Sequence, residues 1–360
     1  MASPIKRIGI LTSGGDCAGL NAVIRAVVHR AIRGYGWEVY GIRRGTDGLA
    51  ERPVDAVELS FKDVPGYLML MSGTILGTTS RGDPFEVKMP DGSTLADKII
   101  EGYHMLGLDA LIGIGGDGSM AILQKLADRG GWQIVGIPKT IDNDVGLTEN
   151  AVGFNTAVEV ATEALDRLHF TAASHSRVMI LEVMGRDAGH IALTAGIAGA
   201  ADVILIPEIP YSLESIRNKI ESRRRLGKNY SQIIVSESVR NAQGDSVTQI
   251  DPTGRTRYGG IGHYLAGRIG EMTGAETRVT VLGHVQRGGT PSPLDRVIAS
   301  AFGVNAVDLI AKERFNRIVT WQRRAVVDIR IADAIASYAS VDPNGALVAT
   351  ARGLGVCLGD

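Results

Sequence analysis

The sequence has few cysteines, no excess of either charge and no long apolar run. Its 360 residues include two cysteines, which excludes a disulfide-stabilised scaffold and a zinc site built from several cysteines. Lys and Arg number 38 against 39 Asp and Glu, and without a basic excess we expect no nucleic-acid partner. No stretch of about 18 uninterrupted apolar residues occurs, so we expect no membrane span and a cytoplasmic protein.

Glycine, by contrast, is abundant. The chain has 46 glycines among 360 residues, well above the number that an average share of about 7% would give. They follow no collagen-like period, which places them in tight turns and in loops of close approach. The hydrophobic fraction of 44% and the charged fraction of 21% are those of a globular protein. The length allows two or three domains, or one large α/β unit.

Short apolar runs alternate with helical patterns along the chain. Residues 7–12 and 37–42 predict strands on either side of a helix over 21–33. The same order repeats, and such alternation predicts mostly parallel sheets with helices on both faces. Further strands are expected at 110–114, 134–137, 177–183, 203–206, 232–236 and 278–285, and further helices at 154–169 and 212–225.

Two glycine-rich segments each lie between a predicted strand and a predicted helix. They are Ser13-Gly14-Gly15-Asp16 and Gly115-Gly116-Asp117-Gly118-Ser119. Backbone N–H groups at a helix N-terminus attract anions, so the pair predicts a phosphate site at the carboxyl ends of parallel strands. Asp117 would repel a phosphate unless it holds a divalent cation, which favours a metal-dependent site. The alternative for Asp117 is a helix N-cap.

A dense polar segment directly follows the predicted strand 134–137. It reads Lys139-Thr140-Ile141-Asp142-Asn143-Asp144. If the segment stays extended, Asp142 and Asp144 face the same way. One carboxylate could then take a proton from a substrate hydroxyl while the other supports a metal or its waters. A polar loop with side-chain caps is the alternative.

Basic side chains stand in loops beside the later strands. Taken singly, each is an ordinary surface charge or core histidine, but as a set they suit recognition of a phosphorylated substrate. They are Arg177, Arg186, Arg278, His284 and Arg287. The residues together predict Mg²⁺-dependent phosphoryl transfer to an anionic substrate, in a protein with neither a Walker P-loop nor a protein-kinase signature.

Five motifs in order resemble the 6-phosphofructokinase family, from residue 5 to about 310. They are LTSGGD (11–16), GGDGS (115–119), PKTIDND (138–144), MGRDAG (184–189) and GHVQRGG (283–289). The resemblance implies an α/β fold of two similar three-layer α/β/α domains with mostly parallel sheets and an active site in the cleft between them. It also implies a donor domain of residues 1–153 with 286–336, and a sugar-phosphate domain of residues 154–285 with 337–360.

The reaction that the resemblance implies is transfer of the terminal phosphoryl group of ATP to the 1-hydroxyl of fructose 6-phosphate, in glycolysis. Asp142 would be the general base, Thr140, Asp144 and Arg186 would assist, and Asp117 would hold Mg²⁺. The implied donor site comprises Gly14, Gly15, Arg81, Gly116, Asp117, Gly118, Ser119 and Lys139. The implied sugar-phosphate site comprises Thr140, Ile141, Asp142, Arg177, Met184, Gly185, Arg186, Glu237, Arg278, His284 and Arg287.

Some of these residues would act between subunits. By the resemblance, Arg177 and Arg278 would reach the sugar phosphate bound by a neighbouring copy, so we expect a homo-oligomer. A homotetramer is the common state in the family, and a dimer is the alternative.

The phosphoryl donor depends on two positions in the family. Gly118 leaves room for a nucleotide and favours ATP, whereas Lys139 is typical of pyrophosphate users. A pyrophosphate- or ADP-dependent enzyme is therefore the alternative. A non-catalytic sugar-phosphate sensor on the same fold is the alternative from another class, and the presence of Asp117, Asp142 and Asp144 argues against it.

Overall fold

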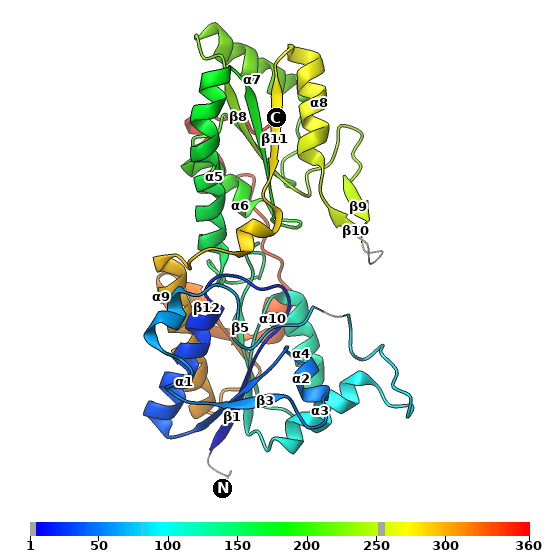
Figure 1. Ribbon diagram of the computed structural model, residues 1–360, viewed down its shortest axis with the longest axis vertical. Helices are drawn as coiled ribbons and strands as arrows, with labels where there is room; N and C mark the ends of the chain where they lie inside the picture. Colours follow the sequence, from blue (N-terminus) through cyan, green and yellow to red (C-terminus); the bar gives the residue numbers. More distant parts are fainter. Residues whose placement is uncertain (1–4, 81, 251–255) are drawn as a thin grey trace. The chain divides into compact units, whose positions relative to one another are not determined.

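A computed structural model describes residues 5–80, 82–250 and 256–360 (Figure 1). The chain divides into two compact units. Unit 1 comprises Met1–Asn155 and Arg287–Tyr338, and unit 2 comprises Thr156–Gln286 and Ala339–Asp360. Within the described ranges, no helix has the length and apolar character that crossing a membrane requires.

Unit 1 is built on a seven-stranded sheet. Its five central strands run parallel, and β3 and β13 pair antiparallel at the two edges. In order across the sheet the strands are β13 (Ala325–Arg330), β12 (Arg317–Gln322), β5 (Ile134–Pro138), β4 (Ala110–Gly115), β1 (Arg7–Thr12), β2 (Glu38–Ile42) and β3 (Ala56–Leu59).

Helices cover both faces of this sheet. The helices α1 (Leu20–Tyr35) and α9 (Pro293–Ala311) pack against each other on one face, with the 3₁₀ turn η1 (Gly66–Leu70) beside α1. The other face carries α2 (Asp47–Ala50), α3 (Leu95–Met105), α4 (Asp117–Gly130) and α10 (Ile331–Ile335).

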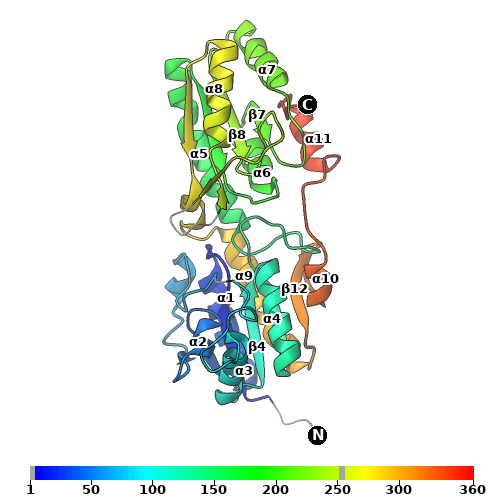
Figure 2. The same cartoon turned by 90° about the vertical axis from the view of Figure 1, so that its right-hand side faces the viewer.

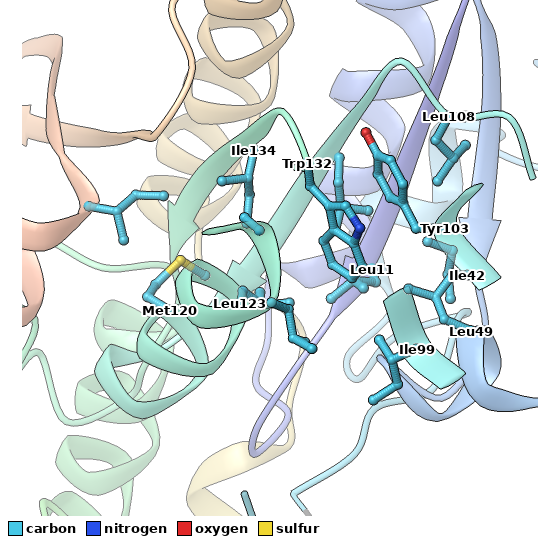
Figure 3. Close-up of a cluster of buried hydrophobic side chains, with 14 of the residues drawn as sticks. Leu11, Ile42, Leu49, Ile99, Tyr103, Leu108, Met120, Leu123, Trp132 and Ile134 are labelled. Carbon is cyan, nitrogen blue, oxygen red and sulfur yellow. The ribbon is translucent and has the colours of Figure 1, made fainter. Parts of the chain in front are cut away.

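The core under α3 and α4 is close-packed. Leu11, Leu111 and Leu123 are fully buried there. Tyr103 stacks on Trp132 with ring centroids 4.6 Å apart (Figure 3). Burying such aliphatic side chains stabilises a fold by roughly 1.5–3 kcal/mol each. This core holds the carboxyl ends of β1 and β4 and the start of α4 in place.

Unit 2 is built on a four-stranded, fully parallel sheet. Its order is β11 (Thr277–Val281), β6 (Val178–Val183), β8 (Ser231–Ser236) and β7 (Val203–Leu205). One face carries α7 (Leu213–Arg225) and α8 (Ile261–Thr273). The other carries α6 (His190–Ala198), against which α11 (Ala346–Gly353) packs (Figure 2), and α5 (Phe154–His175), which begins in unit 1. An antiparallel hairpin of β9 (Thr248–Ile250) and β10 (Thr256–Tyr258) precedes α8.

The α/β fold with mostly parallel sheets, expected from strand–helix alternation, is confirmed. One strand prediction was too long: residues 278–285 were expected to be extended, but β11 ends at Val281 and a 3₁₀ turn, η2 (Gly283–Arg287), follows. The turn begins at Gly283, whose φ of +49° lies in the left-handed region and ends extended structure.

Candidate active site

Three loops meet at one edge of the unit 1 sheet. They follow β1, β4 and β5, which are parallel neighbours and so end at the same edge. The Ser13 N–H donates to the Ile114 carbonyl at 2.8 Å, and the Lys139 N–H donates to the Gly115 carbonyl at 2.9 Å. The two glycine-rich segments and the polar segment after β5 therefore form one surface.

Gly14 is at the centre of these loops. Its φ is +83°, and a Cβ there would lie 2.9 Å from Ser119 Oγ and 3.3 Å from Lys139 Nζ. The loop is tied down by its neighbours: the Gly14 N–H donates to the Thr79 carbonyl at 2.8 Å, and Thr78 Oγ1 donates to the Gly14 carbonyl at 2.6 Å. A hydroxyl and an ammonium group thus approach a bare backbone, which is the arrangement that anion sites use. Arg81, predicted to join this site, lies outside the described residues.

Lys139 is a buried cation. Its side chain is 4% exposed, and it donates a hydrogen bond to the Gly15 carbonyl oxygen. Burial, with a smaller contribution from Arg287, lowers the pKa of Lys139 below its ordinary value. An anion that reaches the loops would favour the charged form of this amine, because opposite charges interact strongly where water is excluded.

Arg287 lies against the same loop. Its NH1 donates to the Asp16 carbonyl at 2.9 Å and would lie 2.6 Å from a Cβ on Gly15. The sequence grouped Arg287 with the sugar-phosphate residues, and the structure places it beside Gly15 of the first glycine-rich segment.

Helix α4 begins at the second glycine-rich segment. Gly116 is its N-cap and Asp117 its first residue, so the N-cap alternative for Asp117 was wrong. Gly118 has open space: a Cβ there would meet nothing within 4 Å. Among the residues that the structure describes, no three His, Cys, Asp or Glu side chains converge as a metal cage. Asp117 fits a Mg²⁺ that takes its other ligands from phosphates and water, as this ion prefers.

The polar segment after β5 is bent rather than extended. Asn143 has a φ of +55°, so the condition under which Asp142 and Asp144 would face the same way is not met. The Asn143 amide fixes this turn by accepting from the Ala151 N–H at 2.9 Å and donating to the Glu149 carbonyl at 3.1 Å. Asp142 and Asp144 are 3% and 2% exposed.

Thr140 and Asp142 interact directly. The Asp142 N–H donates to Thr140 Oγ1 at 3.1 Å, and that hydroxyl lies 3.4 Å from Asp142 Oδ2. Ile141, between them, is buried. The local turn therefore places the Thr140 hydroxyl beside both the backbone and one carboxylate oxygen of Asp142.

In unit 2, the site residues that the sequence predicted in the loops after β6 and β8 contact each other. Gly185 has a φ of +150°, and a Cβ there would lie 2.6 Å from the Ala188 carbonyl, so only glycine fits. Arg186 has a φ of +49°, a conformation that costs of order 1–3 kcal/mol for a side-chain-bearing residue and is often found at functional sites. The Arg186 N–H donates to Glu237 Oε1 at 3.2 Å.

Two residues that sequence reasoning missed hold this loop. Gln286 Oε1 accepts from the Met184 N–H at 2.7 Å, and Glu208 accepts from the Gly189 N–H at 2.9 Å and the Val341 N–H at 2.8 Å. The loop is thus fixed at both of its ends. The motif GHVQRGG contained a signal for Gln286, whereas no local pattern marks Glu208.

The remaining predicted residues divide between the two edges of the unit 2 sheet. His284 is exposed in η2, after the carboxyl end of β11. Arg177 precedes β6, and Arg278 is the second residue of β11, so both lie at the amino edge. A strand of six residues spans roughly 20 Å, so these arginines do not converge with Met184, Gly185 and Arg186 in the same unit.

Comparison with known proteins agrees with these motifs. The chain is 62% identical over 359 residues to "ATP-dependent 6-phosphofructokinase 1" of Synechocystis sp., covering 99% of each protein. It is 63% identical over 360 residues to the protein of the same name from Nostoc sp., covering 99% of this chain and all of the relative.

Solved structures show the same fold. The Pichia pastoris phosphofructokinase in the T-state matches with a TM-score of 0.81 and 31% identity, over 93% of this chain and 36% of that longer chain. A pyrophosphate-dependent phosphofructokinase from Nitrosospira multiformis matches with a TM-score of 0.82 at 22% identity, over 99% of this chain and 93% of the other. The family model for phosphofructokinase matches residues 7–310. The chain therefore belongs to the phosphofructokinase family.

Proposed function

We propose that this protein is an ATP-dependent 6-phosphofructokinase, which transfers the terminal phosphoryl group of ATP to the 1-hydroxyl of fructose 6-phosphate. The observation that carries the proposal is the meeting of three loops at one edge of the unit 1 sheet, with the buried Asp142 on the third. Relatives at 62% and 63% identity over nearly the whole chain bear that name. The product is fructose 1,6-bisphosphate, and a glycolytic role places the enzyme in the cytoplasm.

The donor phosphates are assigned to the glycine-rich loops of unit 1. Gly14, Gly15, Gly116 and Gly118 supply backbone that an oxyanion can approach closely, and Ser119 supplies a hydroxyl beside Gly14. Lys139 supplies a positive charge next to the same loop. Mg²⁺, held by Asp117, would neutralise charge on the donor phosphates. Arg81 is assigned to this site from the resemblance alone.

The acceptor hydroxyl is assigned to Asp142. Its carboxylate takes the proton of the sugar 1-hydroxyl as that oxygen attacks the terminal phosphorus, and the bond from this phosphorus to the ADP oxygen breaks, so that ADP leaves. Thr140, which accepts from the Asp142 N–H, and Asp144 would position the acceptor and the base. Arg186 and backbone N–H groups stabilise charge on the transferring group. The exposed loop position of Arg186 allows its side chain to reach a ligand.

The sugar phosphate is assigned to the loops at the carboxyl edge of the unit 2 sheet, together with Arg287. Met184, Gly185, Arg186 and Glu237 would contact the sugar, and His284 and Arg287 its 6-phosphate. Arg177 and Arg278, at the opposite edge, would serve the site of a neighbouring subunit. Their placement supports that assignment, because about one strand length separates them from the Met184–Arg186 loop.

The donor is tested by measuring fructose 1,6-bisphosphate formed from fructose 6-phosphate and Mg²⁺ with ATP, ADP or pyrophosphate. Turnover with ATP alone supports the proposal. Turnover with pyrophosphate or ADP would show that Lys139 outweighs the open space at Gly118. Absence of turnover with all three donors would favour the sugar-phosphate sensor.

The shared site is tested with hybrid oligomers. Asp142→Asn and Arg177→Ala chains, carrying different tags, are expressed together and the mixed oligomer is purified. If Arg177 serves the neighbouring site, some sites in the hybrid regain both residues and activity returns above that of either parent. If both residues serve the same chain's site, the hybrid stays as inactive as its parents.

A further inference from the structure

One carboxylate at the amino edge of the unit 2 sheet joins two arginines. Glu276 Oε1 lies 2.9 Å from Arg177 NH2 and also accepts from Arg278 NH2. The two arginines come from the neighbouring parallel strands β6 and β11, and the register pairs Thr277 with Val178. Glu276 and Arg177 therefore stand side by side, one residue before their strands begin.

The three side chains differ in how firmly the protein holds them. Arg177 is 24% exposed, and in the part of the chain that the structure describes its Nε is buried without a hydrogen-bond partner. Glu276 and Arg278 are 46% and 52% exposed. The buried stem of Arg177 thus fixes Glu276, and Glu276 in turn restrains the more exposed Arg278.

The net positive charge of this group favours binding of an anion. Two guanidinium groups and one carboxylate carry a net charge of +1, and the hydrogen bond from Arg177 keeps the pKa of Glu276 below its ordinary value. Each guanidinium has five N–H donors, so both can bind an oxyanion while bonded to Glu276. Without Glu276, the two cations would repel each other, and the more exposed Arg278 would sample many rotamers.

We propose that Glu276 is a positioning residue that holds Arg177 and Arg278 together as one binding group for the phosphate ester. The inference rests on the proposed function, in which these arginines complete a neighbouring subunit's site. Holding the exposed Arg278 beside the more buried Arg177 before the ligand arrives removes part of the entropy cost of binding, an effect of about tenfold on affinity. Loss of the negative charge alone would instead strengthen binding of an anion, so the direction of the change in KM distinguishes positioning from a simple charge effect.

Steady-state kinetics of Glu276→Ala and Glu276→Gln test the proposal. Glu276→Ala is expected to raise the KM for fructose 6-phosphate about tenfold, with kcat and the KM for ATP unchanged. Glu276→Gln, which keeps an acceptor oxygen, should give a smaller rise. Glu271→Gln, which breaks the exposed Arg268–Glu271 pair on α8, is the matched control and should change nothing.

A double-mutant cycle separates positioning from other effects. In an Arg177→Ala, Arg278→Ala background, Glu276→Ala should change the KM for fructose 6-phosphate by less than twofold. A tenfold change in that background, an unchanged or lowered KM in Glu276→Ala, or dissociation of the variant's subunits in sedimentation velocity would each overturn the proposal. Wild-type turnover is measured first: its absence refutes the proposed reaction, whereas normal turnover with an unaffected Glu276→Ala refutes only the role of Glu276.

Discussion

Lys139 donates a hydrogen bond to the carbonyl oxygen of Gly15, although the two residues are 124 positions apart in the chain. The bond runs from the loop after β5 to the loop after β1 and passes the end of β4, which lies between them. Burial removes water from the ammonium group, and the Gly15 carbonyl replaces part of that hydration. The first glycine-rich segment and the segment that carries Asp142 are thereby held together.

Asp142→Asn should remove most of the turnover. The amide keeps the shape of the side chain but cannot accept the proton of the sugar hydroxyl, so kcat should fall about 10²–10⁴-fold. The KM for fructose 6-phosphate should stay within a few-fold, as measured by coupled assay. Asp166→Asn, at an exposed position of α5, is the control and should be neutral. A kcat within tenfold of wild type would refute the role of Asp142 as base.

Gly118→Asp should weaken ATP binding without unfolding the protein. A Cβ at Gly118 meets nothing within 4 Å, and an acidic residue in the first turn of a helix is favourable, so the melting temperature should hardly change. The new carboxylate would stand next to Asp117 and repel the donor phosphates, raising the KM for ATP by tenfold or more. Gly118→Ala adds a methyl group without charge and should leave the KM for ATP nearly unchanged. Equal effects of the two variants would argue against the electrostatic explanation.

Gly14→Ala should damage both stability and donor binding. The left-handed φ of +83° and the contact of 2.9 Å with Ser119 Oγ should together lower the free energy of unfolding by about 2 kcal/mol. Gly36→Ala is the matched control, since its φ is +68° but its surroundings are open. It should cost about 1 kcal/mol and leave the kinetics unchanged. Urea unfolding and ATP titrations of the two variants check this difference; a normal KM for ATP in Gly14→Ala would contradict the assigned phosphate loop.

Cys17 should resist thiol reagents in the folded protein. Burial raises the pKa of the Cys17 thiol to about 12, and its Sγ donates to the Val152 carbonyl at 3.4 Å. At pH 8, iodoacetamide should therefore modify the half-buried Cys357 first and Cys17 only after denaturation, as followed by peptide mass spectrometry. Rapid labelling of Cys17 in the native protein would contradict this expectation.

The same thiol contributes to the dependence of stability on pH. Because its folded-state pKa lies above the ordinary value of 9.0, the thiol's contribution is fully present below pH 9 and is lost as the pH rises through about 12. The wild type should lose unfolding free energy over that range faster than Cys17→Ala does, in urea titrations at several pH values. Parallel pH profiles of the two proteins would show that the thiol makes no such contribution.

Much of the fold could be read from local patterns. The apolar runs at 7–12, 110–114 and 134–137 became β1, β4 and β5, because short runs rich in β-branched residues and followed by turn residues favour buried strands. Parallel strands of one sheet end at the same edge, so the sequence also predicted a common edge for the loops after them, though not that the three strands are neighbours. The strand predicted at 278–285 was too long at its C-terminal end, because no local pattern showed that Gly283 would take a left-handed conformation.

The residue types of the site were likewise evident in the sequence, whereas their partners were not. The glycines, the carboxylates after β5 and the arginines stand out by spacing and chemistry alone. The bend at Asn143, the support of Met184 by Gln286 and the pairing of Arg177 with Glu276 depend on segments far apart in the chain. Sequence alone thus determined which groups are available, because strand and loop propensities are local. Only the tertiary structure decided which of them meet, because sheet order and register bring distant residues into contact.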